Sequence, residues 1–325
     1  MTQQRARYTI DDVRELCRRC NNWGRWGPDD ELGTLNFITP EKIVEASRLV
    51  KKGRVFSLAI PFDANGPQNY GGQRFNPIHW MLRDGGDVVA GLGEYTDDAV
   101  MMPLQSASQW DSLAHAFFEG KMYNDRGPEL VTSFGAQKNS IEKFKERIVS
   151  RGVLLDIARY KGKRWLEGGE IVYTEDLDGC AAREGVEVRR GDIVFIRMGQ
   201  MAEVKERGHF GTYSGGDRNL GGGPGPSPGL SITTSPWFHG NELAGYATDT
   251  CCTDVIPNEV EDIRCRMPLH RILIVHCGIL MGEIFDLDEL AEDCAQDGVY
   301  EFMTVAPVLP VTGAVGSPVN PQAIK

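Results

Sequence analysis

The sequence predicts an α/β or α+β domain with at least one covered β-sheet. Short apolar runs that suit buried strands alternate with segments of helical periodicity. The 325 residues are 41% apolar and 25% charged, which is the balance of a soluble globular protein. No repeat of fixed period and no long linker divides the chain, so residues 1–325 are expected to form one domain.

The first 53 residues are expected to form a helical arm, and residues 54–325 the core. One helix has clear boundaries: Thr39 caps it, Pro40 takes the first position, and Glu41 suits the positive end of the helix dipole. Gly53 is the expected end of this helix. The arm packs on the core or reaches across to a second subunit.

The core is predicted from its apolar runs. Strands are expected at 153–158, 193–198, 244–248 and 272–276, with helices at 175–183, 236–243 and 287–295. The densest glycine and proline stretch, 214–229, interrupts this pattern. A long irregular segment inside a domain is usually a binding loop, so we expect a mobile loop beside a site, with a disordered surface insertion as the alternative.

Charge and composition exclude several classes of function. The 35 basic and 46 acidic residues give a net charge of −11, which disfavours nucleic-acid binding. The longest apolar run, 272–281, is too short and too interrupted to cross a membrane. The N-terminus lacks an apolar signal core, and the eight cysteines are scattered. A cytoplasmic protein with reduced thiols is therefore expected.

Two polar clusters are candidates for chemistry. In the first, Gln109 and Asp111 share a side if the segment is extended, and Asp111 and His115 share a face if a helical turn begins there. Gln105 opens the same cluster. The pattern can aim an amide oxygen, a carboxylate and an imidazole at one point. A polar loop with a helix-capping aspartate is the alternative.

The second cluster joins His270, ahead of an apolar run, to Glu283, which follows a glycine-rich turn. A carboxylate embedded in apolar sequence requires a partner or a metal ion, because burying it bare is costly. The alternative is a surface glutamate that begins the next helix. The chain has no G-x-S-x-G motif, no P-loop and no G-x-G-x-x-G after a strand, which disfavours serine-hydrolase and nucleotide-binding functions.

Segment 105–115 resembles the metal-binding signature His-x-Gly-Thr-His-x-Asp-x-Pro-x-His of the cyclase family, which includes kynurenine formamidases, isatin hydrolases and trans-dienelactone hydrolases. Asp111 and His115 match the signature, whereas Gln105 and Gln109 replace its first two histidines. The later pair of the family, a histidine before an apolar strand and a glutamate about a dozen residues on, matches at 270 and 283. The segment GYATDT (245–250) looks like the strand end that lies beneath the site in the family. The segments NNWGRWGPDDELGTLNFITPEK (21–42) and GAVGSPVNP (313–321) are similar to those of a longer branch of the family.

The resemblance implies an α/β fold, a single compact domain with a mixed β-sheet core flanked by helices, of the swivelling β/β/α type. It also implies one divalent metal ion, Zn²⁺ or Mn²⁺. Asp111, His270 and Glu283 would hold the ion, with Gln109 as a weaker ligand. A metal-activated water would attack a small cyclic or aryl amide or a lactone, with His115 as the proton shuttle. Two alternatives are a metal-dependent dehydratase or cyclase and a non-catalytic small-molecule-binding member. A homodimer or homotetramer is expected, since family members are oligomers with sites near subunit contacts.

Further residues are candidates for substrate contact, each with a structural alternative. Trp110 would stack on a flat substrate ring or fill the core. His239 would line the pocket or be a satisfied helix residue. The remaining candidates are Gln105, His79 and Trp80.

Overall fold

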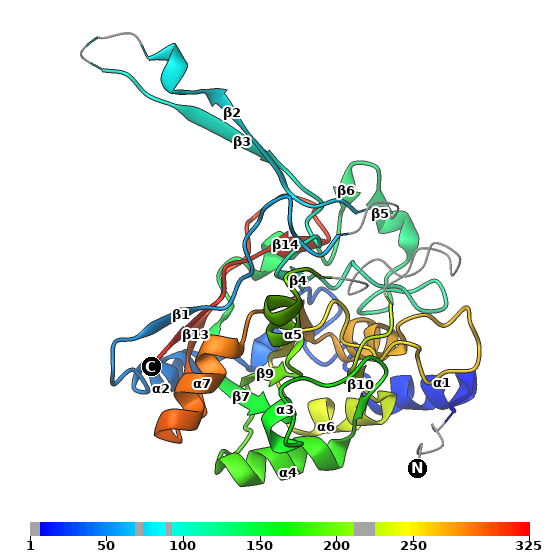
Figure 1. Ribbon diagram of the computed structural model, residues 1–325. Coiled ribbons are helices and arrows are strands. Elements are labelled where there is room, and N and C mark those ends of the chain that lie inside the picture. The colour runs from blue at the N-terminus through cyan, green and yellow to red at the C-terminus, as the bar shows by residue number, and fades with distance from the viewer. Residues whose placement is uncertain (1–6, 69–73, 89–90, 92, 211–224) are drawn as a thin grey trace.

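One nine-stranded mixed sheet, flanked by helices, organises the computed structural model, which describes residues 7–68, 74–88, 91, 93–210 and 225–325 (Figure 1). The predicted mixed α/β class is confirmed. The strand order is β1 (Val55–Ser57), β15 (Gln322–Ile324), β13 (Glu301–Val305), β7 (Val149–Asp156), β9 (Ile193–Arg197), β11 (Gly245–Thr248), β12 (Leu280–Glu283), β4 (Gln109–Asp111) and β14 (Gly316–Pro318).

The centre of the sheet is parallel and both of its edges are antiparallel. Strands β7, β9, β11 and β12 run parallel, and β4 and β14 continue the sheet antiparallel beyond β12. Parallel neighbours need crossover connections, which are usually helical. Here the crossovers contain α3 (Ile157–Tyr160), α4 (Thr174–Glu184), α5 (Gln200–Arg207), α6 (Ser235–Gly240) and the π-helix η7 (His270–Cys277), and α7 (Asp288–Asp297) follows β12.

Short elements complete the described chain. The 3₁₀ helices are η1 (Gly33–Phe37), η2 (Gly85–Asp87), η3 (Pro128–Leu130), η4 (Ile141–Phe144) and η6 (Ile232–Thr234). Three two-stranded sheets pair β2 (Ile78–Arg83) with β3 (Asp97–Met101), β5 (Val131–Thr132) with β6 (Gly135–Ala136), and β8 (Ile171–Val172) with β10 (Gly229–Leu230). No helix in the described ranges is long and apolar enough to span a membrane.

Most of the predicted core elements form close to the expected positions. The strands at 193–198 and 244–248 correspond to β9 and β11, and the three predicted helices to α4, α6 and α7. The strand expected at 153–158 instead runs from Val149 to Asp156. It ends there because the Asp156 carboxylate accepts a hydrogen bond from the Arg159 backbone N–H and so caps α3.

The strand predicted at 272–276 is wrong, because this segment lies in η7, residues His270–Cys277. A short, fully apolar run fits a buried helix as well as a buried strand, and periodicity alone does not separate the two. Gly278 ends the helix in the left-handed conformation, with φ of +69°. The strand of this region is β12, which begins two residues later.

The N-terminal region is helical, as expected, and packs on its own chain. Thr9 forms a capping box at the start of α1 (Ile10–Arg19), which contacts η7. Trp23 fixes the following turn: its Nε1–H donates to the Val275 carbonyl at 2.7 Å, and its ring stacks on His276 with centroids 4.7 Å apart. The helix α2 (Pro40–Ser47) has the predicted Thr39 cap but ends before Gly53.

The half-buried His276 ring predicts that the stability of the protein decreases in acid. Burial lowers the pKa of His276 to about 4, whereas a histidine in the unfolded chain has a pKa of about 6.5. Between these two pH values, the unfolded chain binds a proton at this residue and the folded chain does not. Stability is therefore lost as the pH falls from 6.5 towards 4. His276→Phe, which keeps an aromatic ring beside Trp23, should show a smaller loss of unfolding free energy between pH 7 and pH 5 in urea titrations. The exposed-site variant His79→Gln should lose as much as the wild type, and an unchanged pH dependence in His276→Phe would contradict the assignment.

The glycine- and proline-rich segment 214–229 lies mostly outside the described residues. Its described end joins the core, since Ser227 exchanges two backbone hydrogen bonds with Ile256 and the strand β10 pairs with β8. The expected loop beside a site stays a prediction, as does the division into an arm and a core at residue 53.

The strands β2 and β3 form a hairpin that projects away from the body (Figure 1). Ile78 pairs with Met101 and Trp80 with Ala99, so these four side chains share one face. Most of that face is exposed, and Leu82, at the β-bulge between Met81 and Arg83, is 64% exposed. The hairpin therefore carries an uncovered apolar face within the described chain.

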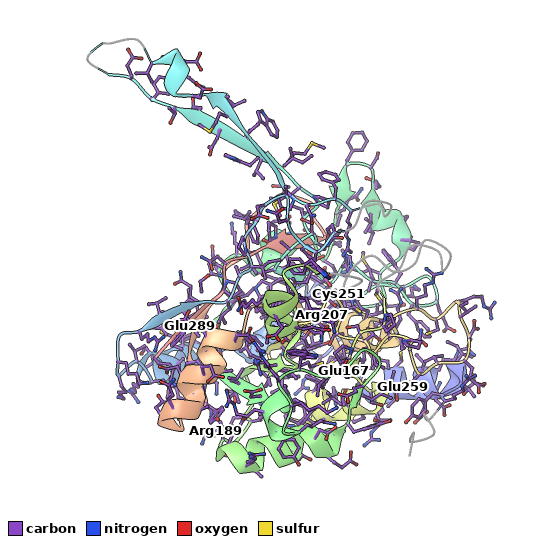
Figure 2. The ribbon with its side chains drawn as sticks, viewed as in Figure 1. Glu167, Arg189, Arg207, Cys251, Glu259 and Glu289 are labelled. Carbon is purple, nitrogen blue, oxygen red and sulfur yellow. The ribbon has the colours of Figure 1, made fainter. Side chains whose placement is uncertain are left out.

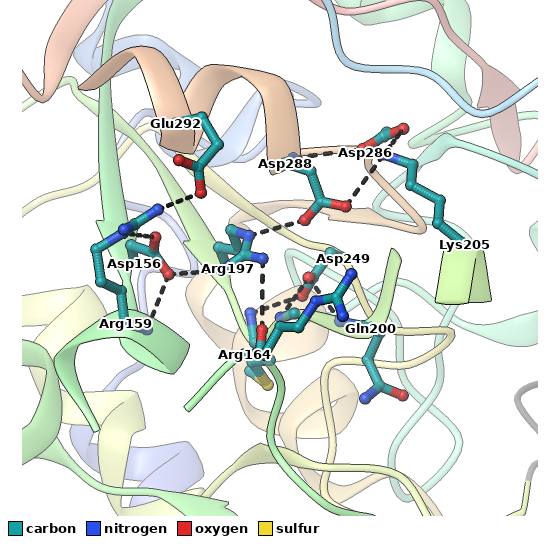
Figure 3. A network of polar contacts seen from close by, with 12 residues as sticks. Asp156, Arg159, Arg164, Arg197, Gln200, Lys205, Asp249, Asp286, Asp288 and Glu292 are labelled. Carbon is teal, nitrogen blue, oxygen red and sulfur yellow. Dashed lines mark hydrogen bonds and ion pairs between the residues drawn. The ribbon is translucent and has the colours of Figure 1, made fainter. Parts of the chain in front are cut away.

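A buried ionic network connects the carboxyl ends of the central strands (Figure 3). Arg197, at the end of β9, pairs with Asp156 and Asp288, each at 2.9 Å. Asp249, just after β11, accepts backbone N–H groups of Met198, Gly199 and Gln200. These contacts fix the turn into α5 and the start of the segment after β11, which carries part of the site described next.

Candidate metal centre

The site is built on β4 and β12, whose register decides which side chains face it. Glu283 pairs with Gln109 and Met281 with Asp111. Because side chains alternate along a strand, Gln109, Asp111 and Glu283 point to one side of the sheet. Gly282 lies opposite Trp110 on the other side, and a Cβ at this glycine would meet the indole at 2.4 Å. The missing side chain of Gly282 makes room for Trp110.

Asp111, His270 and Glu283 converge, with one potential ligand atom of each lying within 4.8 Å of the others. His270 Nε2 is 3.8 Å from Asp111 Oδ2 and 3.5 Å from Glu283 Oε1. All three side chains are buried. Two carboxylates and one imidazole from three separate segments thus surround one point.

Asp111 and Gln109 leave buried oxygen atoms without a hydrogen-bond donor in the described chain. Both carboxylate oxygens of Asp111 and the amide Oε1 of Gln109 are in this position. A buried carboxylate without donors is costly, and a cation is the partner that would offset the cost. The oxygen-rich donor set with one imidazole fits Mn²⁺ and Zn²⁺. The residues present therefore fit a divalent metal ion.

Asp254 orients the imidazole of His270. Its Oδ2 accepts from His270 Nδ1 at 2.7 Å, and its Oδ1 accepts from the Leu269 N–H at 2.7 Å. Burial opposes a charge on the ring, but Asp254, Glu283 and Asp111 outweigh burial and raise the pKa of His270 to about 9. No pattern in the sequence indicates this role for Asp254. A carboxylate that holds the second nitrogen of a ligating histidine is a common arrangement at metal sites.

Asp254→Asn is therefore expected to weaken metal binding by about 10–100-fold, the usual effect of removing such a partner. Isothermal titration of the metal-free protein with Mn²⁺ or Zn²⁺ measures this affinity. The matched control is Asp262→Asn, a carboxylate paired only with Arg264 on the surface. Equal affinities in Asp254→Asn and the wild type would contradict the positioning role.

Glu283 is held by donors from two segments. Its Oε2 accepts from Gln109 Nε2 at 3.0 Å, and its Oε1 accepts from the Thr253 N–H at 2.9 Å. Burial raises the pKa of Glu283 to about 7, against the opposing charge of His270 and with further repulsion from Asp111. Gln109 therefore turns its amide N–H₂ to Glu283, which leaves its oxygen free.

His115 lies at the edge of the group and is more exposed than the three converging residues, with 22% of its side chain exposed. Its Nε2 is 3.7 Å from Asp111 Oδ1, and its Nδ1 is 3.4 Å from the Gln105 amide nitrogen. Burial lowers the pKa of His115, against the charge of Asp111, which favours the neutral imidazole, the form that can accept a proton.

Four of the sequence candidates lie elsewhere in the subunit. The expectation that Trp110 stacks on substrate is wrong: its ring packs in the core against Phe285, and its Nε1–H donates to the Ala306 carbonyl. His239 contacts Asn22 at 3.3 Å, beside the C-terminal end of η7. His79, paired with Asp98, and Trp80 lie on the projecting hairpin. Their contact with substrate stays a prediction.

The fold and the converging side chains define an α/β protein with a candidate metal centre on one side of its mixed sheet. The Cyclase family model matches residues 56–255, and the chain belongs to this family. A crystal structure described as a novel cyclase is 38% identical and has a TM-score of 0.84, covering 95% of this chain and 99% of that chain.

Two more distant structures share the fold. Isatin hydrolase A from Labrenzia aggregata, bound to benzyl benzoate, is 18% identical with a TM-score of 0.60, covering 87% of this chain and 97% of its own. An isatin hydrolase bound to the product analogue thioisatinate is 15% identical with a TM-score of 0.62, covering 88% and 98%. No match was found among curated proteins.

Proposed function

We propose that the protein is a metal-dependent hydrolase that opens a small cyclic or aryl amide or a lactone. The observation that carries the proposal is the buried Asp111 carboxylate, which faces His270 and Glu283 with neither oxygen hydrogen-bonded. Membership of the Cyclase family and the fold shared with isatin hydrolases support it.

In this proposal, Asp111, His270 and Glu283 hold one divalent ion, Zn²⁺ or Mn²⁺, and the Gln109 amide oxygen is a weaker fourth ligand. A divalent ion at such a site lowers the pKa of water and polarises a carbonyl oxygen. His115 accepts a proton as the water attacks and returns it to the leaving nitrogen or oxygen. Gln105 fixes the far side of the imidazole through Nδ1.

The test combines elemental analysis of the purified protein with turnover of formamides, cyclic amides and lactones in ¹⁸O-labelled water. We expect one ion per chain and one labelled oxygen in the product. Turnover without label would favour the dehydratase or cyclase reaction. A protein that binds no stoichiometric ion and turns over none of these compounds would contradict the hydrolase proposal and favour a binding protein.

We also propose that the protein is a homo-oligomer in which a second copy covers the hairpin β2–β3. An isolated two-stranded hairpin is marginally stable in water, and this one carries the exposed apolar side chains of Ile78, Trp80 and Leu82. Further exposed apolar side chains that a second copy would cover are Phe134, which lies between β5 and β6 and is 98% exposed, and Leu309 and Val311, which lie between β13 and β14. In a two-fold symmetric dimer, each protomer would place its hairpin on its partner and receive the hairpin of that partner in return.

Leu82→Asp should dissociate this assembly. Burying a leucine stabilises an interface by about 1.5–3 kcal/mol. Each of the two exchanged hairpins would lose one buried leucine, so the dissociation constant of the dimer should rise by about 10²–10⁴-fold. Sedimentation equilibrium measures the change, with far-UV circular dichroism to check folding. Val299→Asp, at an exposed position outside the hairpin, is the control. A monomeric wild type, or an oligomer unaffected by Leu82→Asp, would contradict the proposal.

A further inference from the structure

Two adjacent cysteines follow β11, outside the residues assigned to the metal centre. The Cys251 and Cys252 sulfur atoms are 3.8 Å apart. Cys251 is partly exposed, whereas the other seven cysteines are buried (Figure 2). The pair therefore offers solvent one accessible thiol with a second thiol directly behind it.

The segment that carries this pair also forms hydrogen bonds with two of the candidate metal ligands, Glu283 and His270. The next residue, Thr253, donates its backbone N–H to Glu283, and Asp254 accepts from His270 Nδ1. On the other side of the pair, the Thr250 carbonyl accepts from the Ile284 N–H at 3.0 Å. Residues 250–254 thus contact both sides of the site, and a backbone change at 251–252 would be transmitted to Glu283 and His270.

Internal hydrogen bonds hold this segment in its present form. The Thr250 hydroxyl donates to the Cys252 carbonyl at 2.7 Å, and the Cys252 thiol donates to the Asp254 carbonyl at 3.5 Å. The second bond needs a free Cys252 thiol. Any reaction that consumes this thiol removes a contact to Asp254, the residue that orients His270.

We propose that Cys251 and Cys252 are a reversible oxidation site, which hydroperoxides convert into a disulfide between adjacent residues. The Cys251 sulfur attacks one peroxide oxygen, the O–O bond breaks, and a sulfenic acid and one water (or alcohol) form. The Cys252 sulfur then attacks the Cys251 sulfur, the S–O bond breaks, the hydroxyl group leaves as water with the proton of the Cys252 thiol, and the S–S bond forms. Overall, two thiols lose two hydrogen atoms and the peroxide is reduced by two electrons.

Closing this ring must bend the chain. Adjacent Cα atoms are about 3.8 Å apart across a trans peptide, which is shorter than the roughly 4.4–6.8 Å that an ordinary disulfide spans. The bond would be strained and therefore readily reduced. The bent segment would move Thr253 and Asp254 and weaken the hold on the metal ion. This last consequence rests on the proposed function, whereas bond formation does not.

Mass spectrometry of the whole metal-loaded protein after hydrogen peroxide treatment tests the bond. The tryptic peptide 219–264 contains Cys251 and Cys252 and no other cysteine. We expect this peptide to become about 2 Da lighter, the mass of two hydrogen atoms, and to regain that mass with dithiothreitol. Elemental analysis after buffer exchange should show loss of the bound ion in parallel, with recovery when metal is added back after reduction.

Two variants make the result specific. Cys251→Ser should bind metal as the wild type does but lose the mass change and the sensitivity to peroxide. Cys265→Ser, at a buried cysteine of the same region, should respond as the wild type does. A sulfinic acid on Cys251 with Cys252 still reduced, or an unmodified peptide, would overturn the proposed bond. Disulfide formation with unchanged metal content would overturn only its effect on the site. A wild type that binds no metal would count against the proposed function and leave the mass result valid.

Discussion

Asp111→Asn should abolish metal binding and turnover while making the metal-free protein more stable. The substitution keeps the shape of the side chain but removes the negative charge from two oxygens that lack donors. The loss of metal affinity should exceed the roughly 10–100-fold that outer partners such as Asp254 contribute. The gain in stability follows because a buried carboxylate that accepts no hydrogen bond is costly, and the His270 imidazole, 3.8 Å away, offsets only part of that cost.

Two measurements on the same protein separate this result from a folding defect. Metal titration gives the affinity, and thermal unfolding in a chelator gives the stability of the metal-free form. Asp125→Asn, at an exposed carboxylate, should change neither quantity. An Asp111→Asn protein that still binds one ion would remove the basis of the metal centre. A metal-free form that is less stable than the wild type would show that the carboxylate has a donor in solution.

His115→Ala should retain the ion and lose most of its turnover. His115 touches Asp111 only at 3.7 Å and is not one of the three converging residues, so the ion keeps its ligands. A positioned acid–base group typically contributes about 10²–10⁴-fold to the rate, and we expect kcat to fall by that factor. Added imidazole, which can enter the space left by the ring, should restore part of the activity.

The metal content of His115→Ala decides between two roles. A full complement of metal with low kcat supports proton transfer, whereas loss of the ion would make His115 a ligand instead. His209→Ala, at an exposed position just after α5, is the control and should retain both metal and turnover. Normal turnover in His115→Ala would exclude the shuttle.

The regular part of the fold could be predicted because it depends on local pattern. The runs at 193–198 and 244–248 have the length and flanking residues of buried strands, and β9 and β11 form there. The run at 272–276 has the same composition but forms η7, because Gly278 and the packing of α1 and Trp23 favour a helix. That choice is tertiary, and no local pattern contains it.

The site was only partly accessible from sequence. Asp111 and Glu283 lie far apart in the chain, and only the resemblance to the cyclase family joined them; the residues alone gave no reason to pair the two segments. Asp254 has no local signature, since its role depends on the position of His270 in the folded chain. The sequence did contain a warning about Trp110, because a residue between two site residues on a strand must face the opposite side.

The pairing of the three-residue strand β4 predicts that the number of residues just before the site does not vary. It is paired on both sides, with β12 and with β14, in a fixed alignment. Adding or deleting a single amino acid just before Gln109 would turn each side chain of β4 to the opposite face of the sheet. The Trp110 indole would then lie where the ion is expected, and the Asp111 carboxylate would lie in the apolar core. Natural variation in length should therefore collect in the outlying hairpin, while this short stretch is inherited unchanged in spacing.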